Sequence, residues 1–259
     1  MTSEAEGVLT IENRHGVRVL TLNRPHVLNA VNGALARAID QALTDVDVDP
    51  SVRVTIITGA GRAFCAGADL KAITAEGNQV HIKGKGFAGI AYRERIKPLI
   101  CAVEGVAVGG GFEICLAADM VTAASGSTFA LPEVLRSRLA AGGGLLRLGR
   151  ALPTAIAMEI GLTGLPITAE RALELGLVNR VTEPGGALAA AVDLADAIAA
   201  GAPLSVAASK KIINAAATQA ERDVWHLTWE EIKTIRASDD SREGTQAFVE
   251  KRAARWTGH

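Results

Sequence analysis

The stretch VGGGFEICLAAD, residues 108–119, places three consecutive glycines against a carboxylate in an otherwise apolar segment. Consecutive glycines cost conformational entropy, so they usually mark special backbone angles or a close approach to the backbone. A short helix is expected to follow them, from Gly111 to Ala118. Glu113 would lie about one turn inside that helix, either exposed at its edge or held in a cleft.

The chain on either side of this stretch is predicted to contain strands and helices in alternation. Two β-prone runs flank residues 13–16, NRHG, which indicates a hairpin. A helix is expected after Asn32 as its N-cap, and VRVTIIT at 52–58 is typical of a strand buried on both faces. Further expected elements are a helix at 90–96, strands at 99–105, 119–124 and 127–132, and a short strand within 176–183. Repeated β-α units favour a mainly parallel sheet with right-handed crossovers.

Helices dominate the sequence from about residue 142 onward. The predicted segments are 143–150, 153–162, 168–175, 186–200, 203–218, 221–237 and 240–254. This tail is too apolar on one face to be left in solvent, so it is expected to pack on the core or on another subunit. By contrast, residues 75–89 hold four glycines and no clear period, and they predict a mobile loop or a frayed helix.

Composition and charge argue against several classes of protein. The 259 residues are 49% hydrophobic but only 3% aromatic, which is typical of a tightly packed fold of small aliphatic side chains. A formal net charge of −1 gives no electrostatic case for binding nucleic acid. No run approaches the roughly 20 apolar residues of a membrane span, and the polar MTSEAEG start lacks a secretory signal pattern. We therefore expect no nucleic-acid or membrane partner and a cytoplasmic location.

Motifs for common cofactors and nucleophiles are also missing from the sequence. Gly59-Ala-Gly61 follows a strand, but Phe64 stands where a dinucleotide fingerprint needs a small residue. There is no phosphate-binding P-loop and no G-x-S-x-G motif. Cys65, Cys101 and Cys115 are widely spaced in apolar surroundings and predict buried free thiols. The histidines show no paired spacing, so no metal site is expected.

Two turns of small residues, 66–69 and 109–111, each follow a strand of the predicted parallel sheet. Where such turns adjoin, their backbone N–H groups can point at one position, especially where a helix begins. Two converging N–H donors form an oxyanion hole, which stabilises charge that develops on a carbonyl oxygen. Small side chains would let a ligand reach the backbone. For either turn alone, a tight β-α connection is the simpler explanation.

Glu113 and Glu133 add a pair of carboxylates to these turns. Either one alone would ordinarily lie on the surface. Together, near an oxyanion hole, they could serve as general acid and base. An apolar pocket raises the pKa of a carboxyl group, and ionisation of one partner raises the pKa of the other further. Pairs whose pKa values are pushed apart in this way can divide into acid and base.

A series of longer motifs runs through the chain in a fixed order. They are NRP (23–25), LNA (28–30), RAFCAGADL (62–70), EGVAVGGGFEICLAAD (104–119), FALPEV (129–134), AGGGLLRLGR (141–150), ITAERALELGLVNRV (167–181) and SKKIIN (209–214). In these motifs the chain resembles the crotonase superfamily, and specifically the enoyl-CoA hydratases. The resemblance covers nearly everything after the first few residues.

This resemblance implies an α/β fold with a distinctive organisation. Residues 1–200 would form a crotonase-like spiral of β-β-α units, and residues 201–259 a helical C-terminal region for trimerisation. The chain would assemble as a homotrimer or a dimer of trimers. The substrate would be an acyl-CoA thioester, so coenzyme A would arrive as part of the substrate and no cofactor would be bound permanently.

The resemblance also implies roles for individual residues. The backbone N–H groups of Ala68 and Gly110 would form the oxyanion hole, and Glu113 and Glu133 match the two glutamates that hydratases of this family use. Three further residues would lie along the pantetheine and adenine of the substrate, namely Ala66, Asp69 and Leu70, with Asp69 also fixing its turn. Three basic residues of the C-terminal half could contact the phosphates of CoA, namely Lys210, Lys211 and Lys251. For each of them, a place on a solvated helix face is at least as well supported.

The sequence departs from the family pattern in the loop after Glu133. A Pro-Gly step usually precedes the paired glycines there, and Ala140 and Ala141 replace it. This change is expected to alter the wall of the acyl pocket. Phe112, bulky beside Glu113, is a second candidate for narrowing or reshaping the site.

The expected reaction is the reversible syn addition of water to a 2-enoyl-CoA. Glu113 would hold and deprotonate the water that attacks C3, and Glu133 would deliver a proton to C2. An isomerase or a specialised acyl-CoA lyase could use the same oxyanion hole with a different placement of water. A non-catalytic acyl-CoA-binding protein would need the hole but not both carboxylates. The sequence does not indicate the acyl group.

Overall fold

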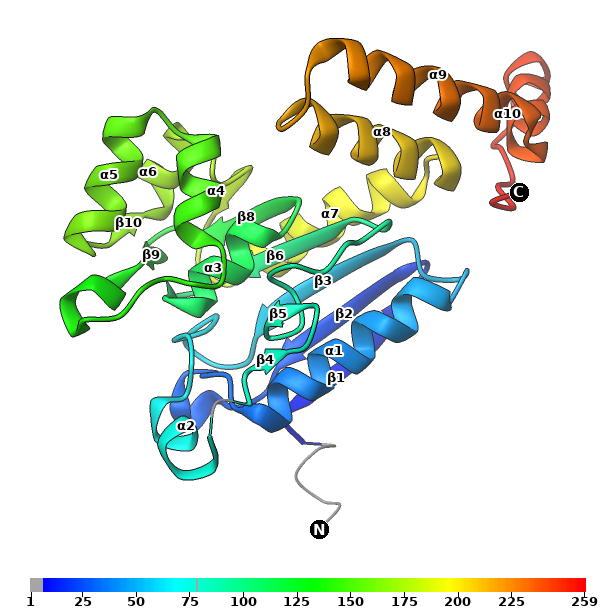
Figure 1. The fold of residues 1–259 in the computed structure, drawn as a ribbon. Coiled ribbons are helices and arrows are strands. Elements are labelled where there is room, and N and C mark those ends of the chain that lie inside the picture. Colours follow the sequence, from blue (N-terminus) through cyan, green and yellow to red (C-terminus); the bar gives the residue numbers. More distant parts are fainter. Residues whose placement is uncertain (1–6, 78) are drawn as a thin grey trace.

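The computed structural model describes residues 7–77 and 79–259 and is built around a six-stranded sheet of order β1-β2-β3-β6-β8-β11 (Figure 1). Its strands are β1 (Leu9–Arg14), β2 (Val17–Leu22), β3 (Val54–Gly59), β6 (Leu99–Val103), β8 (Met120–Ala124) and β11 (Arg180–Thr182). The β1–β2 pair is antiparallel, and every other neighbouring pair is parallel. The prediction of a mainly parallel sheet is therefore confirmed.

The first elements form as their local sequence predicts. His15 and Gly16 connect β1 to β2 with φ values of 41° and 86°, and two left-handed residues suit the twist of a two-residue hairpin. Helix α1 (Gly33–Val48) begins after Asn32, whose side chain accepts a 2.9 Å hydrogen bond from the Leu35 N–H. Asn32 is thus the expected N-cap.

A second, three-stranded sheet lies beside the first and gives the chain its spiral course. Its order is β10-β9-β7, with strands β7 (Val106–Val108), β9 (Thr128–Ala130) and β10 (Ile167–Thr168). Cys65 forms a parallel bridge with Ala107 of β7, and Val31 forms one with Ala68. Each unit thus runs from the large sheet to this smaller layer and then into a helix, as in β6–β7–α3 (α3, Gly110–Ala117).

This arrangement corrects one sequence prediction. The turns at 66–69 and 109–111 do not follow strands of the large sheet directly. They follow the bridged residue Cys65 and the short strand β7, which pair with each other in the smaller layer. This layer is difficult to predict from the sequence, because β7 is three residues long and is separated from β6 by only two residues.

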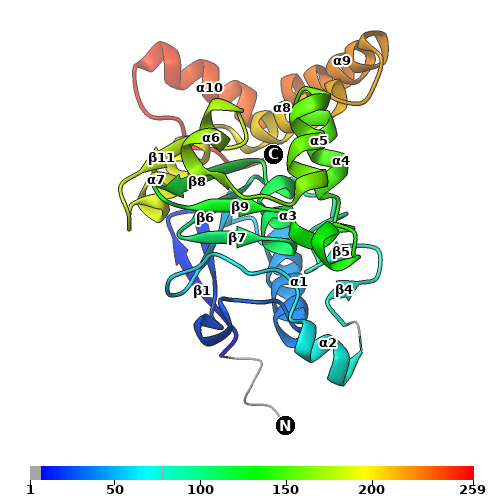
Figure 2. The ribbon, with the colours of Figure 1, turned by 90° about the vertical axis from the view of Figure 1, so that its left-hand side faces the viewer.

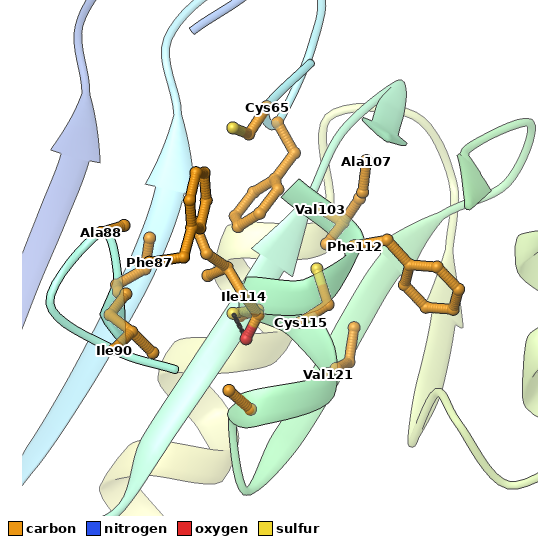
Figure 3. Close-up of a cluster of buried hydrophobic side chains, with 14 of the residues drawn as sticks. Cys65, Phe87, Ala88, Ile90, Val103, Ala107, Phe112, Ile114, Cys115 and Val121 are labelled. Carbon is orange, nitrogen blue, oxygen red and sulfur yellow. Dashed lines mark hydrogen bonds between the residues drawn. The ribbon is translucent and has the colours of Figure 1, made fainter. Parts of the chain in front are cut away.

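Helices cover both faces of the large sheet. Helix α7 (Ala187–Ala199) packs on one face, where Ala187, Ala191 and Ala195 are fully buried against β3 and β6. Their small side chains let the helix approach the sheet closely, which accounts for the alanine-rich sequence. The other face packs against α1 and α3 in a larger cluster that includes Leu35, Phe64 and all three cysteines, which are free and buried as predicted. Figure 3 shows part of this cluster, with Cys65 and Cys115 among its side chains.

The predicted helical segments of the second half are all helices. They are α4 (Gly144–Ala151), α5 (Thr154–Thr163), α6 (Ala169–Glu174), α7, α8 (Pro203–Ala216), α9 (Glu221–Ala237) and α10 (Asp239–Glu250). Figures 1 and 2 show α8, α9 and α10 extending beyond the sheet as an arm. The division into a 1–200 core and a 201–259 helical region stays a prediction. Within the described residues no single helix is long and apolar enough to cross a membrane. Helices α7 and α8 together have the length and composition of a span, but the chain bends by 110° between them.

Two predictions for residues 75–96 need correction. Residues 90–96 are not a helix, because Ala88 and Gly89 turn the chain with φ values of 54° and 70° and Arg93 is held to α1 by ion pairs with Asp40 and Asp47. Seven residues of helical propensity cannot outweigh such anchors. Where a mobile loop or a frayed helix is expected at 75–89, the described residues contain the end of α2 (Leu70–Glu76) and a small hairpin of β4 (His81–Ile82) and β5 (Gly86–Phe87).

Candidate active site

A cavity of about 570 Å³ opens where the two small-residue turns meet. Both turns and both glutamates contribute to its wall. The volume of the cavity and the mixture of apolar and polar residues around it are typical of a small-molecule site. The lining residues are Ala66, Gly67, Ala68, Leu70, Ile73, Val80, His81, Phe87, Val108, Gly109, Gly110, Glu113, Pro132, Glu133, Arg136, Arg138, Leu139, Ala141 and Gly142. Of the seven residues predicted for the oxyanion hole, proton transfer and the substrate path, all but one therefore lie around one space.

The backbone N–H groups of Ala68 and Gly110 are available to a ligand. Gly110 is the first residue of α3, so its N–H has no intrahelical acceptor. Neither N–H donates a hydrogen bond to any acceptor in the part of the chain that the structure describes. The two turns also touch, because a Cβ on Gly67 would lie 3.1 Å from the Gly110 nitrogen. These are the parts of an oxyanion hole.

The three glycines of the turn serve packing as well as access. Gly109 has φ 57° and ψ −125°, and a Cβ there would lie 2.8 Å from Oε1 of Glu133. A Cβ on Gly110 would lie 2.4 Å from the Phe87 ring, and one on Gly111 would lie 2.1 Å from the Cys65 carbonyl oxygen. The expected reason, room for a ligand, is thus only part of the explanation.

Glu113 is held inside the protein and faces the cavity, which settles the choice between a helix edge and a cleft. The residue is 5% exposed, and its Oε1 accepts a 3.0 Å hydrogen bond from the Gly144 N–H at the start of α4. Burial raises the pKa of Glu113 above its ordinary value, and the charge of Glu133 raises it further, although the Gly144 N–H opposes the shift. Such a carboxyl group is suited to proton transfer.

Glu133 follows Pro132 in the short 3-10 helix η2 (Pro132–Arg136). Burial raises the pKa of Glu133, and the Arg136 charge opposes that shift. Its Oε2 is buried and has no hydrogen-bond partner among the described residues. A buried oxygen without a partner calls for a proton or a ligand. The structure therefore presents two carboxyl groups, each with a raised pKa, to one cavity.

Among the residues predicted to form the oxyanion hole, transfer protons or lie along the substrate, Asp69 is the one that does not line the cavity. Its carboxylate caps α2 by accepting from the Ala72 N–H at 3.1 Å and forms a 3.0 Å ion pair with Arg24. Burial alone would raise the pKa of Asp69, but these contacts hold it below its ordinary value. Its role in fixing the turn is therefore seen in the structure, while a contact with substrate stays a prediction.

Phe112 does not shape the site, contrary to expectation. It is 2% exposed, packs on Phe129 with ring centroids 5.3 Å apart, and is absent from the cavity wall. Figure 3 shows Phe112 and Phe87 on either side of α3. Phe112 points from α3 into the core, and the aromatic side chain that lines the cavity is instead Phe87 of β5. Of the two departures after Glu133, Ala140 is buried and Ala141 lines the wall.

Several residues of the site were not predicted from the sequence. Arg136 and Arg138 line the cavity, and Arg147 of α4 donates to the carbonyls of Gly142 and Ala91. The only sequence signal for Arg136 and Arg138 as site residues is their position three and five residues after Glu133. Of the candidate phosphate contacts, Lys210 is instead paired with Asp119 at 2.7 Å and Lys211 with Glu231 at 2.6 Å.

Comparisons with known proteins identify relatives of the whole chain. A family model described as enoyl-CoA hydratase/isomerase matches residues 12–259. An enoyl-CoA hydratase of Mycobacterium tuberculosis is 39% identical over 249 residues, covering 94% of each chain. A carnitinyl-CoA dehydratase of Proteus mirabilis is 40% identical over 258 residues, covering 96% of this chain and 98% of that one. A crystal structure of an enoyl-CoA hydratase from Mycobacterium tuberculosis matches with a TM-score of 0.94 and 46% identity, covering 98% of this chain and 100% of that chain.

Proposed function

The chain belongs to the enoyl-CoA hydratase/isomerase family and is an enzyme of the hydratase type, and on that premise we propose that it adds water reversibly to the double bond of a 2-enoyl-CoA. The observation that carries this proposal is the meeting of a buried and a half-buried carboxyl group, each with a raised pKa, with two free backbone N–H donors around one cavity. Relatives named hydratase and dehydratase support it, because these names describe opposite directions of one kind of reaction.

In the proposed mechanism, the thioester oxygen accepts hydrogen bonds from the N–H groups of Ala68 and Gly110. Enolate-like charge grows on that oxygen as water attacks C3, and loss of one such donor typically costs about 2.7–4 kcal/mol of transition-state stabilisation. Donors fixed by the backbone need no reorganisation during the reaction. The resulting 3-hydroxyacyl-CoA leaves with all atoms of the added water.

The two glutamates would divide the proton transfers. Glu113, anchored by the Gly144 N–H through Oε1, would use its other oxygen to hold and deprotonate the water. Glu133, whose buried Oε2 has no partner among the described residues, would carry the proton that is delivered to C2. The raised pKa of both groups supports proton transfer by each of them, because one must release and the other accept a proton near neutral pH.

The test is to assay the purified Glu113→Gln and Glu133→Gln variants with crotonyl-CoA. We expect each to lose about 10²–10⁴-fold in kcat, the usual contribution of a general acid or base. Glu159→Gln, at an exposed position of α5, is the matched control and should retain full activity. Near-complete activity in either active-site variant would contradict the proposal. Conversion of a 3-enoyl to a 2-enoyl thioester without hydroxyacyl product would instead support the isomerase alternative, and tight binding of acyl-CoA without turnover would support the binding protein.

We further propose that the chain assembles as a homotrimer or a dimer of trimers through its C-terminal arm. Large apolar side chains of α8, α9 and α10 are exposed in the single chain, namely Ile213, Trp225, Trp229, Phe248 and Val249. Exposed apolar surface of this kind is typical of an interaction site. The cytoplasmic location stays a prediction from the sequence.

A further inference from the structure

We propose that the acyl group of the substrate ends in a carboxylate, and that Arg136 and Arg138 bind it at the wall of the cavity. This inference rests on the proposed hydratase function and names its substrate class, the CoA monothioester of an unsaturated dicarboxylic acid. The chemistry at C2 and C3 is the same water addition as before. The two arginines would select the substrate without taking part in proton transfer.

The two arginines belong to the turn that carries Glu133. Arg136 ends η2, Ser137 turns the chain with φ 51° and ψ 39°, and the Arg138 N–H closes the turn by donating to the Glu133 carbonyl at 3.0 Å. Both arginines line the cavity. The segment that positions one carboxyl group of the proposed mechanism therefore also brings two cations to the same space.

Neither guanidinium group is engaged by any residue that the structure describes. Some arginines of lower exposure have carboxylate partners, as Arg24 has in Asp69 and Arg93 has in Asp40, whereas Arg136 and Arg138 are exposed at the cavity wall. In the described residues the side chains of Arg136 and Arg138 donate no hydrogen bond and form no ion pair within 4 Å. Arg136 has an electrostatic effect on Glu133, which leaves Arg138 as the cation with the least opposing charge.

The charge of the cavity decides which acyl groups suit it. The acidic side chains among its lining residues are Glu113 and Glu133, and burial favours the neutral form of both. A long apolar acyl chain across Arg136 and Arg138 would strip water from two unpaired cations, which is unfavourable. A quaternary ammonium at the end of the acyl group would be repelled by the positive charges of Arg136 and Arg138. A carboxylate would receive charge-assisted hydrogen bonds, which arginine donates in a planar, bidentate geometry.

The apolar part of the cavity still fits the carbon chain that joins the thioester to this carboxylate. Ile73, Val80 and Phe87 line the cavity with Leu139, whose side chain is 70% exposed. A short hydrocarbon segment can pack there while its charged end reaches the arginines. The competing explanation is that the arginines bind a phosphate of CoA, which every substrate of the enzyme would share.

The experiment compares two substrates that differ only at the end of the chain, trans-2-hexenedioyl-CoA and trans-2-hexenoyl-CoA. Because both carry the same CoA, the ratio of their kcat/KM values reports the acyl end alone. We expect the wild-type ratio to favour the dicarboxylic substrate by about tenfold or more, the typical effect of hydrogen bonds to a charged group. The double variant Arg136→Gln/Arg138→Gln should bring the ratio near one. Arg180→Gln, an exposed arginine of β11 outside the cavity, should leave the ratio at its wild-type value.

A second measurement makes the result independent of turnover. Calorimetric binding of the saturated analogues adipoyl-CoA and hexanoyl-CoA should show the same preference in the wild type and its loss in the double variant. A wild-type preference for the hexenoyl or hexanoyl thioester would overturn the inference. So would an equal fall for both substrates in the double variant, because that result assigns the arginines to CoA. Hydration of hexenoyl-CoA with no dicarboxylic preference would refute this inference alone, whereas absence of any hydration would refute the proposed function.

Discussion

At the scale of single residues, the burial of Glu113 links its proposed catalytic role to the stability of the fold. The folded protein raises the pKa of this carboxyl group above its ordinary value of 4.5, so it binds the proton more tightly than the unfolded chain does. As the pH rises through 4.5 toward the folded-state pKa, the unfolded chain releases its proton first, and the free energy of unfolding falls. The carboxylate is therefore a cost to the fold at neutral pH, as is usual where a site is organised for chemistry.

We accordingly predict that Glu113→Gln stabilises the protein at pH 7.5 but not at pH 4. The amide oxygen can still accept from the Gly144 N–H, so only the charge is lost. The free energy of unfolding at pH 7.5 should rise by about 1 kcal/mol, the size of a typical stabilising substitution. Urea unfolding at both pH values measures this, with Glu159→Gln as the baseline for losing an exposed carboxylate. Equal stability changes at the two pH values would show that Glu113 is not destabilised by burial.

A glycine beside Glu113 gives a second prediction at this scale. A Cβ on Gly142 would lie 2.5 Å from Oε2 of Glu113, and this glycine does not need a positive φ. Gly142→Ala should therefore displace the carboxylate and lower kcat by about 100-fold, because shifts near 1 Å have effects of that size. Gly149→Ala in α4 is the matched control, since its Cβ would meet no atom within 4 Å. The control should keep its activity and gain about 1 kcal/mol of stability from helix propensity. Similar kcat values for the two variants would contradict the prediction.

At the scale of elements, Arg147 fastens α4 to the irregular segment that replaces the predicted helix at 90–96. Its guanidinium donates to the Ala91 carbonyl at 2.6 Å and to the Gly142 carbonyl at 3.3 Å. It thereby holds the loop whose backbone binds Glu113, and its charge lowers the pKa of Glu113. We infer that Arg147 positions the catalytic carboxyl group without touching the substrate.

Replacing Arg147 by Met should therefore change the pH profile as well as the rate. Loss of the cation raises the pKa of Glu113, so the acidic limb of kcat/KM should move to higher pH. Loss of the two hydrogen bonds should lower kcat by about tenfold. Arg147→Lys keeps the positive charge but lacks the planar guanidinium group that donates to both carbonyls. The acidic limb of its pH profile should therefore be closer to that of the wild type than its kcat is. A purely structural role predicts lower stability with an unchanged pH profile.

The elements also show how far the sequence can be interpreted without a structure. Periodicity located the large-sheet strands and the later helices, because long apolar patterns and caps such as Asn32 act locally. In the smaller layer it located β9, but it missed the pairing of β7 with the Cys65 bridge, since these have too few residues for a pattern. The residues around Glu133 and Glu113 were found by motif, whereas Arg147 was missed because its two carbonyl acceptors are set by tertiary contacts rather than by neighbours in sequence.

At the scale of the whole molecule, the arm formed by α8, α9 and α10 gives the last prediction. Phe248 is 85% exposed, and Trp225 stacks on Trp229 at 6.4 Å with both side chains more than half exposed. Aromatic groups of this size dominate the energy of interfaces when they are buried. The purified protein should have a mass of three or six copies of 26.8 kDa by light scattering. Phe248→Glu should shift it toward one copy, because burying an unpaired charge is costly. Val48→Glu introduces the same charge at a 79% exposed position of α1 and should leave the mass unchanged. A wild-type protein that remains a single copy at micromolar concentration would refute the proposed assembly.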